Sequence, residues 1–130
     1  MATVRVLVVD DQAAFLRAMT SVVQETPGFA VAGEASSGEE ALVVAAELLP
    51  DLVLMDVNLP GIDGLEATRW LLGHDYPPVV LLLSTYDEDA GEHFVAESGA
   101  VAYVTKSDFG PDLLQEAWST AVSSSLQSGR

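Results

Sequence analysis

Five apolar runs alternate with five stretches of helical spacing along the chain, and this alternation restricts the fold more than any other feature. The apolar runs lie at residues 4–9, 29–34, 52–55, 79–83 and 102–104. The first, third and fourth runs are nearly continuous Val and Leu, which is typical of strands covered on both faces. Strict alternation of strand and helix predicts a parallel sheet with right-handed crossovers. We expect an α/β fold with a doubly wound, five-stranded parallel sheet in the order 2-1-3-4-5.

Helix start and stop signals occupy the stretches between the apolar runs. Ser37-Gly38-Glu39-Glu40 and Asp63-Gly64-Leu65-Glu66 have the spacing of capping boxes, so each is expected to begin a helix. Gly99 is expected to end the fourth helix and Pro111 to begin the fifth. One face of the first helix is expected to carry the apolar residues Phe15, Met19, Val22 and Val23.

The length and composition of the chain fit one domain. Of its 130 residues, 49% are apolar, which argues against disorder. Residues 1–122 are expected to form the domain, and the serine-rich residues 123–130 a C-terminal tail or the start of a linker. The chain has no cysteine, no signal-peptide pattern and no apolar run near the ~20 residues of a membrane helix. We therefore expect a cytoplasmic protein with no membrane partner.

The charge of the chain is strongly acidic. The formal net charge is -15, with only five basic residues. Binding to nucleic acid depends on Lys and Arg side chains that neutralise phosphates. We therefore expect no direct nucleic-acid binding by this chain, and any DNA-binding role would belong to a segment outside it.

Three carboxylates lie at the ends of the first and third apolar runs. Asp10 and Asp11 follow the first run, and Asp56 follows the third. In the predicted sheet these strands are neighbours at the point where strand order reverses, and ligands bind there beyond the carboxyl ends. Two charges 4 Å apart repel by about 4 kcal/mol at an effective dielectric constant near 20, so the group favours a cation, and oxygen ligands suit Mg²⁺. The alternative is that Asp10 and Asp11 only cap the first helix.

Two further side chains are expected to reach the same crevice. A carboxylate such as Asp56 can accept a phosphoryl group, and this transfer needs mainly positioning and positive charge. Lys106 is the only lysine and follows the fifth apolar run, although lysines are more often solvated surface residues. Ser84 follows the fourth run and could donate a hydrogen bond to a phosphoryl oxygen. The alternatives are that Ser84 is a turn residue, or that its neighbour Thr85 takes this role.

The chain resembles the receiver domains of two-component response regulators, the CheY-like fold, from Val4 to about Val122. The matching segments, in order, are Val8–Asp11, Leu54–Gly64, Leu83–Ser84, Gly99–Ala100 and Tyr103–Lys106. The resemblance implies a switch that takes a phosphoryl group, assists its own phosphotransfer and dephosphorylation, and is not otherwise an enzyme.

The resemblance also implies a role for each matching site residue. Asp56 is expected to be the phosphoacceptor and Mg²⁺ the cofactor. The expected metal ligands are Asp10, Asp11, Asp56 and the backbone carbonyl of Asn58, with Asp11 binding the ion directly.

Three more roles follow from the resemblance. Lys106 is expected to pair with the phosphoryl group and Ser84 to be the switch hydroxyl. Tyr103 is expected to be the aromatic side chain that moves with Ser84, although a half-buried strand aromatic is the simpler structural interpretation. A separate expectation concerns the lifetime of the phosphoryl group: Tyr86 flanks the expected approach of the hydrolytic water, and its bulk is expected to slow hydrolysis.

One departure from the common receiver pattern indicates a subgroup. Many receivers have proline after the lysine, whereas this chain has Ser107, as in receivers of the NarL/FixJ type. Such a parent implies a sensor histidine kinase as partner, dimerisation on phosphorylation, and transcriptional output through a DNA-binding domain outside this chain. The alternatives are a stand-alone receiver, or a pseudo-receiver that is only a protein-interaction module.

Overall fold

The computed structural model describes residues 3–85 and 90–128 of the chain, and its strands form one parallel sheet. The strands are β1 (Val4–Val9), β2 (Phe29–Ala35), β3 (Leu52–Asp56), β4 (Val79–Ser84) and β5 (Ala102–Thr105). Their order in the sheet is β2-β1-β3-β4-β5, and every neighbouring pair is parallel. The predicted α/β fold and strand order are confirmed.

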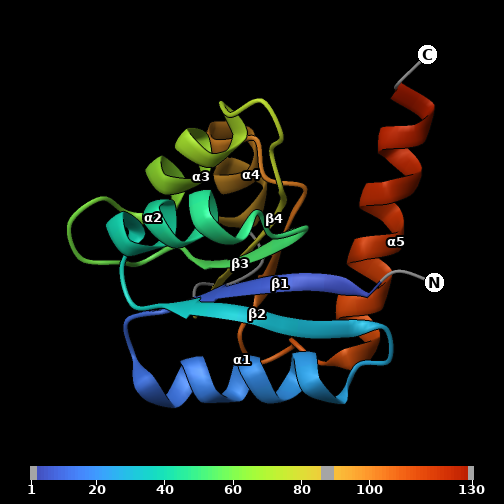
Figure 1. Cartoon of the computed structure of the whole chain (residues 1–130), viewed down its shortest axis with the longest axis horizontal. Coiled ribbons are helices and arrows are strands. Elements are labelled where there is room, and N and C mark those ends of the chain that lie inside the picture. The colour runs from blue at the N-terminus through green and yellow to red at the C-terminus, as the bar shows by residue number, and fades with distance from the viewer. Residues whose placement is uncertain (1–2, 86–89, 129–130) are drawn as a thin grey trace.

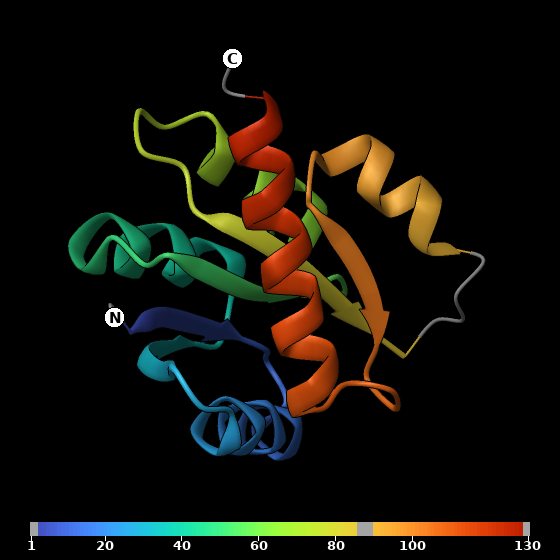
Figure 2. The same ribbon diagram turned by 90° about the vertical axis from the view of Figure 1, so that its right-hand side faces the viewer.

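Helices cover both faces of this sheet. They are α1 (Ala13–Glu25), α2 (Gly38–Leu48), α3 (Gly64–Leu72), α4 (Gly91–Ser98) and α5 (Pro111–Ser128). Helices α2, α3 and α4 lie on one side of the strands and α1 on the other (Figure 1). Helix α5 crosses the sheet on the same side as α1 (Figure 2).

The two-sided cover explains why β1 is an unbroken apolar run. Leu7 and Val9 pack into the core beneath α2 and α3, whereas Val6 and Val8 pack into the core beneath α1 and α5. All four side chains are fully buried. A fully buried Val or Leu side chain contributes about 1.5–3 kcal/mol to the free energy of unfolding, so β1 stabilises the cores on both faces of the sheet.

The predicted helix boundaries agree with the caps in the structure. The Ser37 hydroxyl accepts a hydrogen bond from the Glu40 N–H, and the Asp63 carboxylate accepts one from the Glu66 N–H. Gly99 ends α4 with a positive φ of 85°, which glycine adopts without strain.

Helix α5 is longer than the sequence predicts. It begins at Pro111 as expected, but continues to Ser128, into the segment predicted to be a tail. The division of the chain at residue 122 stays a prediction. Within residues 3–85 and 90–128, no helix is both long enough and apolar enough to span a bilayer.

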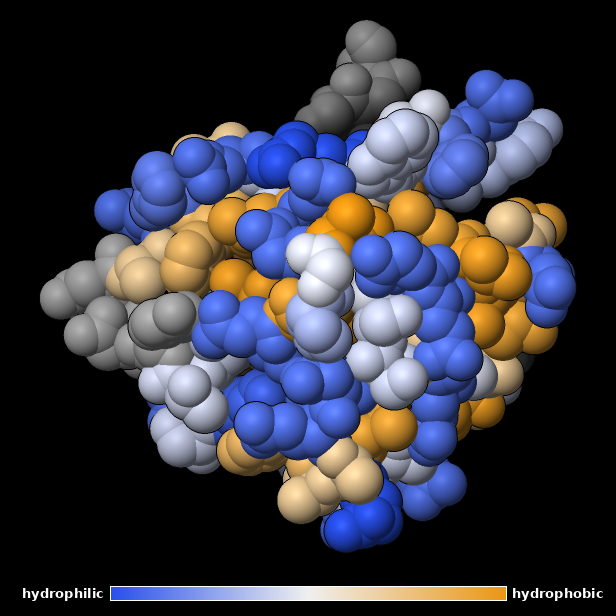
Figure 3. All heavy atoms as spheres, turned by 90° about the vertical axis from the view of Figure 1, so that its left-hand side faces the viewer, coloured by the Kyte–Doolittle hydropathy of each residue, from blue (hydrophilic) through white to orange (hydrophobic). Residues whose placement is uncertain are grey.

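The strand ends bring the candidate site together. β3 and β4 each extend one residue beyond the predicted run, so Asp56 and Ser84 are the last residues of their strands. Met55 pairs with Val9, the residue before Asp10, and Ser84 pairs with Thr105, the residue before Lys106. The carboxyl ends of β1, β3, β4 and β5 therefore meet at one edge of the sheet, which faces the viewer in Figure 3 and is largely hydrophilic at its centre.

Candidate functional site

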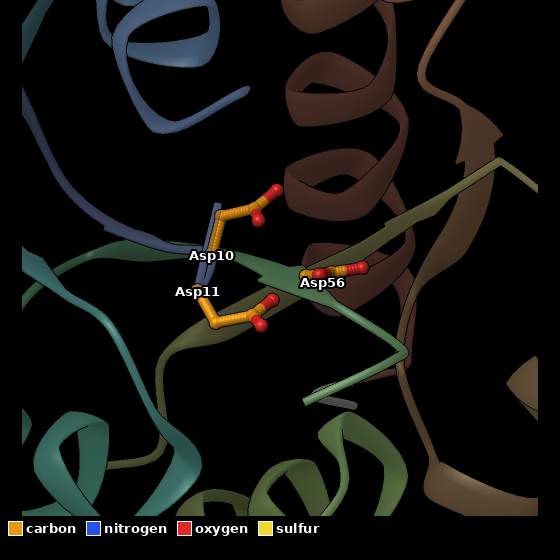
Figure 4. Close-up of side chains that lie close together, drawn as sticks. All are labelled: Asp10, Asp11 and Asp56. Atoms are coloured by element: carbon orange, nitrogen blue, oxygen red, sulfur yellow. The ribbon is translucent and has the colours of Figure 1, made fainter. Parts of the chain in front are cut away.

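Three carboxylates converge at this edge of the sheet. One carboxylate oxygen each from Asp10, Asp11 and Asp56 lies within 4.8 Å of the other two. Asp10 and Asp56 are buried, with 0% and 3% of their surface exposed, whereas Asp11 is open to solvent. Asp10 and Asp11 extend from either side of the chain at the end of β1, both on the side where Asp56 lies (Figure 4). The sequence prediction that these three residues meet is confirmed.

Asp10 does not act as a simple helix cap. Its Oδ1 accepts a hydrogen bond from the N–H of Gln12, the residue before α1, at 2.9 Å. Its Oδ2 lies 2.7 Å from the Lys106 ammonium. The carboxylate thus joins the start of α1 to the end of β5, and the alternative of a cap alone leaves this second contact unexplained.

Lys106 is not a solvated surface lysine, because most of its side chain is covered by the protein. Only 8% of its side chain is exposed, and its Nζ lies 3.6 Å from Asp56 Oδ1 in addition to the contact with Asp10. Its backbone N–H donates to the Ser84 carbonyl at 2.8 Å, which fixes the chain just after β5. A buried ammonium must be paired, and here two carboxylates provide the pairing.

Ser84 and Asn58 line the same space. Ser84 is fully buried, and the Asn58 side-chain amide nitrogen lies 3.4 Å from its hydroxyl oxygen. The Asn58 backbone N–H donates to Asp56 Oδ1 at 3.3 Å. Thr85, the competing hydroxyl, is exposed.

A small cavity of about 110 Å³ opens between these side chains. Its lining residues are Asp11, Gln12, Phe15, Asp56, Asn58, Ser84, Thr85 and Lys106. Carboxylate, amide and hydroxyl groups therefore surround a space that has room for a small polar group.

The sequence pattern alone did not assign Phe15 to the site. It predicted only that Phe15 lies on the apolar face of the first helix, yet the ring centroid lies 3.9 Å from Lys106 Nζ. The signal in the sequence was its place four residues after Asp11, in the first turn of a helix that begins beside the carboxylates.

Tyr103 lies away from the cavity. It is half-buried on β5, with its ring centroid 5.6 Å from that of Phe94 on α4 in an edge-to-face arrangement. A Cβ atom added to Gly91 would contact the Tyr103 ring, so the start of α4 packs closely on this side chain. Tyr86, which sequence analysis linked to hydrolysis, lies outside the described residues.

The environment of Asp56 changes its acidity. Burial raises the pKa of its carboxyl from 3.8 to about 6, and the Asp10 and Asp11 carboxylates add to the increase. Lys106 and the hydrogen bond from the Asn58 N–H act in the opposite direction. Most Asp56 side chains are therefore ionised above pH 7, and this charge makes the metal-free fold less stable.

This raised pKa predicts how stability depends on pH without metal. Because folding raises the pKa of Asp56, ionisation lowers the free energy of unfolding as pH rises from about 4 to 6. The Asn side chain of Asp56→Asn does not ionise, so the variant avoids this decrease in the free energy of unfolding. We expect it to be about 2 kcal/mol more stable than the parent at pH 7.5, because a pKa shift of two units corresponds to at most about 3 kcal/mol. Near pH 4 the gain should be small. Urea unfolding in EDTA at both pH values measures it.

The matched control for this experiment is Asp75→Asn, because Asp75 is an exposed aspartate between α3 and β4. Its stability should change by less than about 0.5 kcal/mol at either pH. An Asp56→Asn variant that gains nothing at pH 7.5 would contradict the raised pKa.

The donor atoms of the site suit a hard divalent cation. The three clustered carboxylates supply only oxygen ligands, and the single ammonium of Lys106 leaves the group with net negative charge. Mg²⁺ is bound in this way, by one or two carboxylates with water or phosphate oxygens completing the coordination. The residues present therefore fit such an ion.

Comparison with known proteins agrees with this geometry. The family model described as the response regulator receiver domain matches residues 6–118. The chain belongs to the response regulator receiver family. It is 45% identical over 104 residues to the response regulator GacA of Pseudomonas viridiflava, a match that covers 79% of this chain and 48% of that protein. This receiver thus spans about half the length of the curated relative.

Solved structures give the same result. A two-component response regulator of the LuxR family from Aurantimonas sp. SI85-9A1 is 32% identical, with a TM-score of 0.82 over 95% of this chain and 87% of that one. The receiver domain of the response regulator NarL from Mycobacterium tuberculosis is 30% identical, with a TM-score of 0.77 over 90% and 98% of the two chains. The predicted resemblance to receivers of the NarL type is confirmed.

Proposed function

We propose that this receiver accepts a phosphoryl group on Asp56 in a Mg²⁺-dependent reaction and thereby changes conformation to control an output. The convergence of three carboxylates and one buried ammonium at the strand ends supports this proposal most strongly. Asp56 is the natural acceptor because its carboxylate lies close both to the acidic pair that follows β1 and to Lys106, 3.6 Å from the ammonium nitrogen. Its pKa of about 6 leaves it ionised at neutral pH, as a nucleophile must be.

The reaction needs little covalent chemistry from the protein. An Asp56 carboxylate oxygen forms a bond to phosphorus while the bond from phosphorus to the donor breaks, which is a P–N bond for a phosphohistidine or a P–O bond for acetyl phosphate. The donor side leaves as histidine or acetate. Lys106, 3.6 Å from Asp56 Oδ1, would neutralise an oxygen of the transferred group. The chain would assist its own phosphotransfer and dephosphorylation in this way, and we propose no other enzymatic activity.

The proposed metal ligands are the carboxylates of Asp10, Asp11 and Asp56 with the backbone carbonyl of Asn58. Asp11 is the best direct ligand, because its carboxylate is exposed and faces the cavity, whereas one oxygen of Asp10 is already paired with Lys106. When bound, Mg²⁺ would supply positive charge for the phosphoryl oxygens. The residues would hold it beside Asp56 and orient the acceptor.

Ser84 and Tyr103 are the proposed switch residues. The Ser84 hydroxyl lies within the cavity lining and could donate to a phosphoryl oxygen on Asp56. Tyr103 is on the next strand and packs against α4, so a shift at Ser84 would be transmitted to the surface formed by α4, β5 and α5. The added charge would bias this two-state element.

The partners follow from the family of the chain. We propose a sensor histidine kinase as the phosphodonor, in the cytoplasm, and transcriptional output through a DNA-binding domain outside these residues. Dimerisation on phosphorylation would couple the phosphorylation of the receiver to the transcriptional output. The similarity to a LuxR-family regulator and to the NarL receiver supports this output, while the net charge of -15 argues against DNA contact by the receiver itself. A stand-alone receiver is the alternative.

A magnesium titration tests the proposed site against a pure interaction module. We expect Asp11→Asn to weaken Mg²⁺ binding about tenfold, because it removes one of the three clustered charges from a solvent-exposed position. Isothermal titration calorimetry at pH 7.5 measures the affinity. Asp75→Asn, on an exposed loop, should bind like the parent. If the parent binds no Mg²⁺ at millimolar concentration, the alternative of a pseudo-receiver is favoured.

A further inference from the structure

The ammonium of Lys106 has neighbours from three elements. Asp10 Oδ2, after β1, lies at 2.7 Å, and Asp56 Oδ1, at the end of β3, lies at 3.6 Å. The third neighbour is the ring of Phe15 in the first turn of α1, whose centroid lies 3.9 Å from Nζ. The proposed function uses the two carboxylates but not the ring.

The ring explains why the Lys106 ammonium stays in the site and is shielded from water, which the two carboxylates alone do not explain. A lysine side chain is long and flexible, and its ammonium is strongly hydrated, so it tends to leave a partly open site for water. Phe15 is half-buried and lines the cavity beside Lys106. The face of an aromatic ring carries negative potential and attracts a cation within about 6 Å. Phe15 thus covers Lys106 on the α1 side and attracts it while the two carboxylate contacts remain in place.

We infer that Phe15 is a positioning residue that holds the Lys106 ammonium in the phosphoryl-acceptor site. This inference rests on the proposed function of Asp56. With the ring present, the ammonium directs its hydrogens toward the carboxylates, where the phosphoryl group arrives. Without the ring, Lys106 spends more of its time in solvent, and transfer to Asp56 slows in proportion.

The expected change is moderate and depends on the ring face, not on side-chain volume. A cation–π contact with a desolvated ammonium shifts a two-state population by about threefold to tenfold or more. Phe15→Leu keeps an apolar side chain of similar size but removes the ring, and should slow phosphoryl uptake from acetyl phosphate by about that factor. Phe15→Tyr keeps the ring and should label within about twofold of the parent.

A single NMR signal tests the contact independently of phosphorylation. Lys106 is the only lysine of the chain, so lysine labelled with ¹³C and ¹⁵N gives one side-chain spin system. In the parent and in Phe15→Tyr, the ring current should move the ε-CH₂ proton resonances upfield of a free lysine. In Phe15→Leu this upfield shift should be lost. Unshifted ε protons in the parent would overturn the inference.

The rate measurement uses the same variants and a control ring from the other end of the sheet. Phe29 lies at the start of β2 and packs edge-to-face on Trp118, with ring centroids 6.4 Å apart. Phe29→Leu loses a ring contact without touching Lys106, so it should be labelled at the parent rate and keep the upfield shift. A general effect of a looser core would slow both leucine variants equally, and that result would overturn a positioning role for Phe15.

The outcomes separate this inference from the proposed function. A parent that is labelled at Asp56 while Phe15→Leu is labelled equally fast overturns the role of Phe15 alone. A parent that takes no label contradicts the proposed function, and the NMR shift then decides whether Phe15 holds Lys106. Slower labelling of Phe15→Leu, restored in Phe15→Tyr and paralleled by the NMR shift, supports the inference.

Discussion

Asp56→Asn is expected to abolish labelling of the protein by acetyl phosphate in the presence of Mg²⁺. An amide is a far weaker nucleophile than a carboxylate, so the rate should fall by about 100-fold or more, to background. The variant keeps the shape of the side chain and an oxygen that can accept from the Asn58 N–H. Intact-mass spectrometry of the phosphoryl adduct measures the loss.

The control for this experiment is again an aspartate outside the site. Asp75→Asn, in the exposed connection before β4, should be labelled at the parent rate. Asp56→Asn also removes the burial penalty of the charged group, so an unlabelled variant should still unfold cooperatively and at higher denaturant in EDTA. Retained labelling of a folded Asp56→Asn variant would show that another residue is the acceptor.

Gly64→Ala is expected to have the largest effect on stability, about 3 kcal/mol. Gly64 is the first residue of α3, and a Cβ placed there would overlap the backbone carbonyl oxygen of Asp56 and lie 2.9 Å from the Cα of Val57. Its N–H donates to the Val57 carbonyl at 2.9 Å, which locks the helix start onto the chain after β3. Neither backbone can yield without moving Asp56, so phosphoryl uptake should also slow.

Gly73→Ala is the matched control, because it makes the same chemical change at the other end of α3. A Cβ at Gly73 would lie 3.5 Å from the Trp70 carbonyl oxygen and 3.6 Å from the Arg69 carbonyl oxygen, which are ordinary van der Waals contacts. Its φ of -83° suits alanine, so stability should change by less than about 1 kcal/mol. Urea unfolding of the two variants compares them directly. Equal stability of both variants would contradict the close approach of α3 to β3.

The sequence predicted the fold of the chain almost completely. β1 was predicted to the residue, and the four other strands each extend one residue further at their carboxyl ends. In β3, β4 and β5 the apolar pattern missed that last residue because it is polar, while backbone hydrogen bonds to the neighbouring strand continue past the apolar run. In β2 the missed residue is Ala35, which is apolar and buried but follows the polar Glu34. The extra residue matters most at Asp56 and Ser84, which are buried strand residues and not loop residues.

The sequence also predicted the membership of the site, with one omission. Asp10, Asp11, Asp56 and Lys106 meet as expected, since parallel strands carry their next residues to the same edge. Phe15 was missed because helical periodicity assigns it to an apolar face, and the rotation of that face relative to the strand ends is set by packing.

The sequence by itself determined the sheet order and which residues gather at its carboxyl edge. The sheet order and the residues at its carboxyl edge both follow from the spacing of apolar residues and from the order of strands and helices along the chain, which can be read directly from the sequence. Only the tertiary structure decided that Lys106 lies closer to Asp10 than to Asp56, that the pKa of Asp56 rises to about 6, and that an aromatic ring covers the ammonium. These depend on separations of a few ångströms between side chains from distant segments, and electrostatic energies change steeply over such distances.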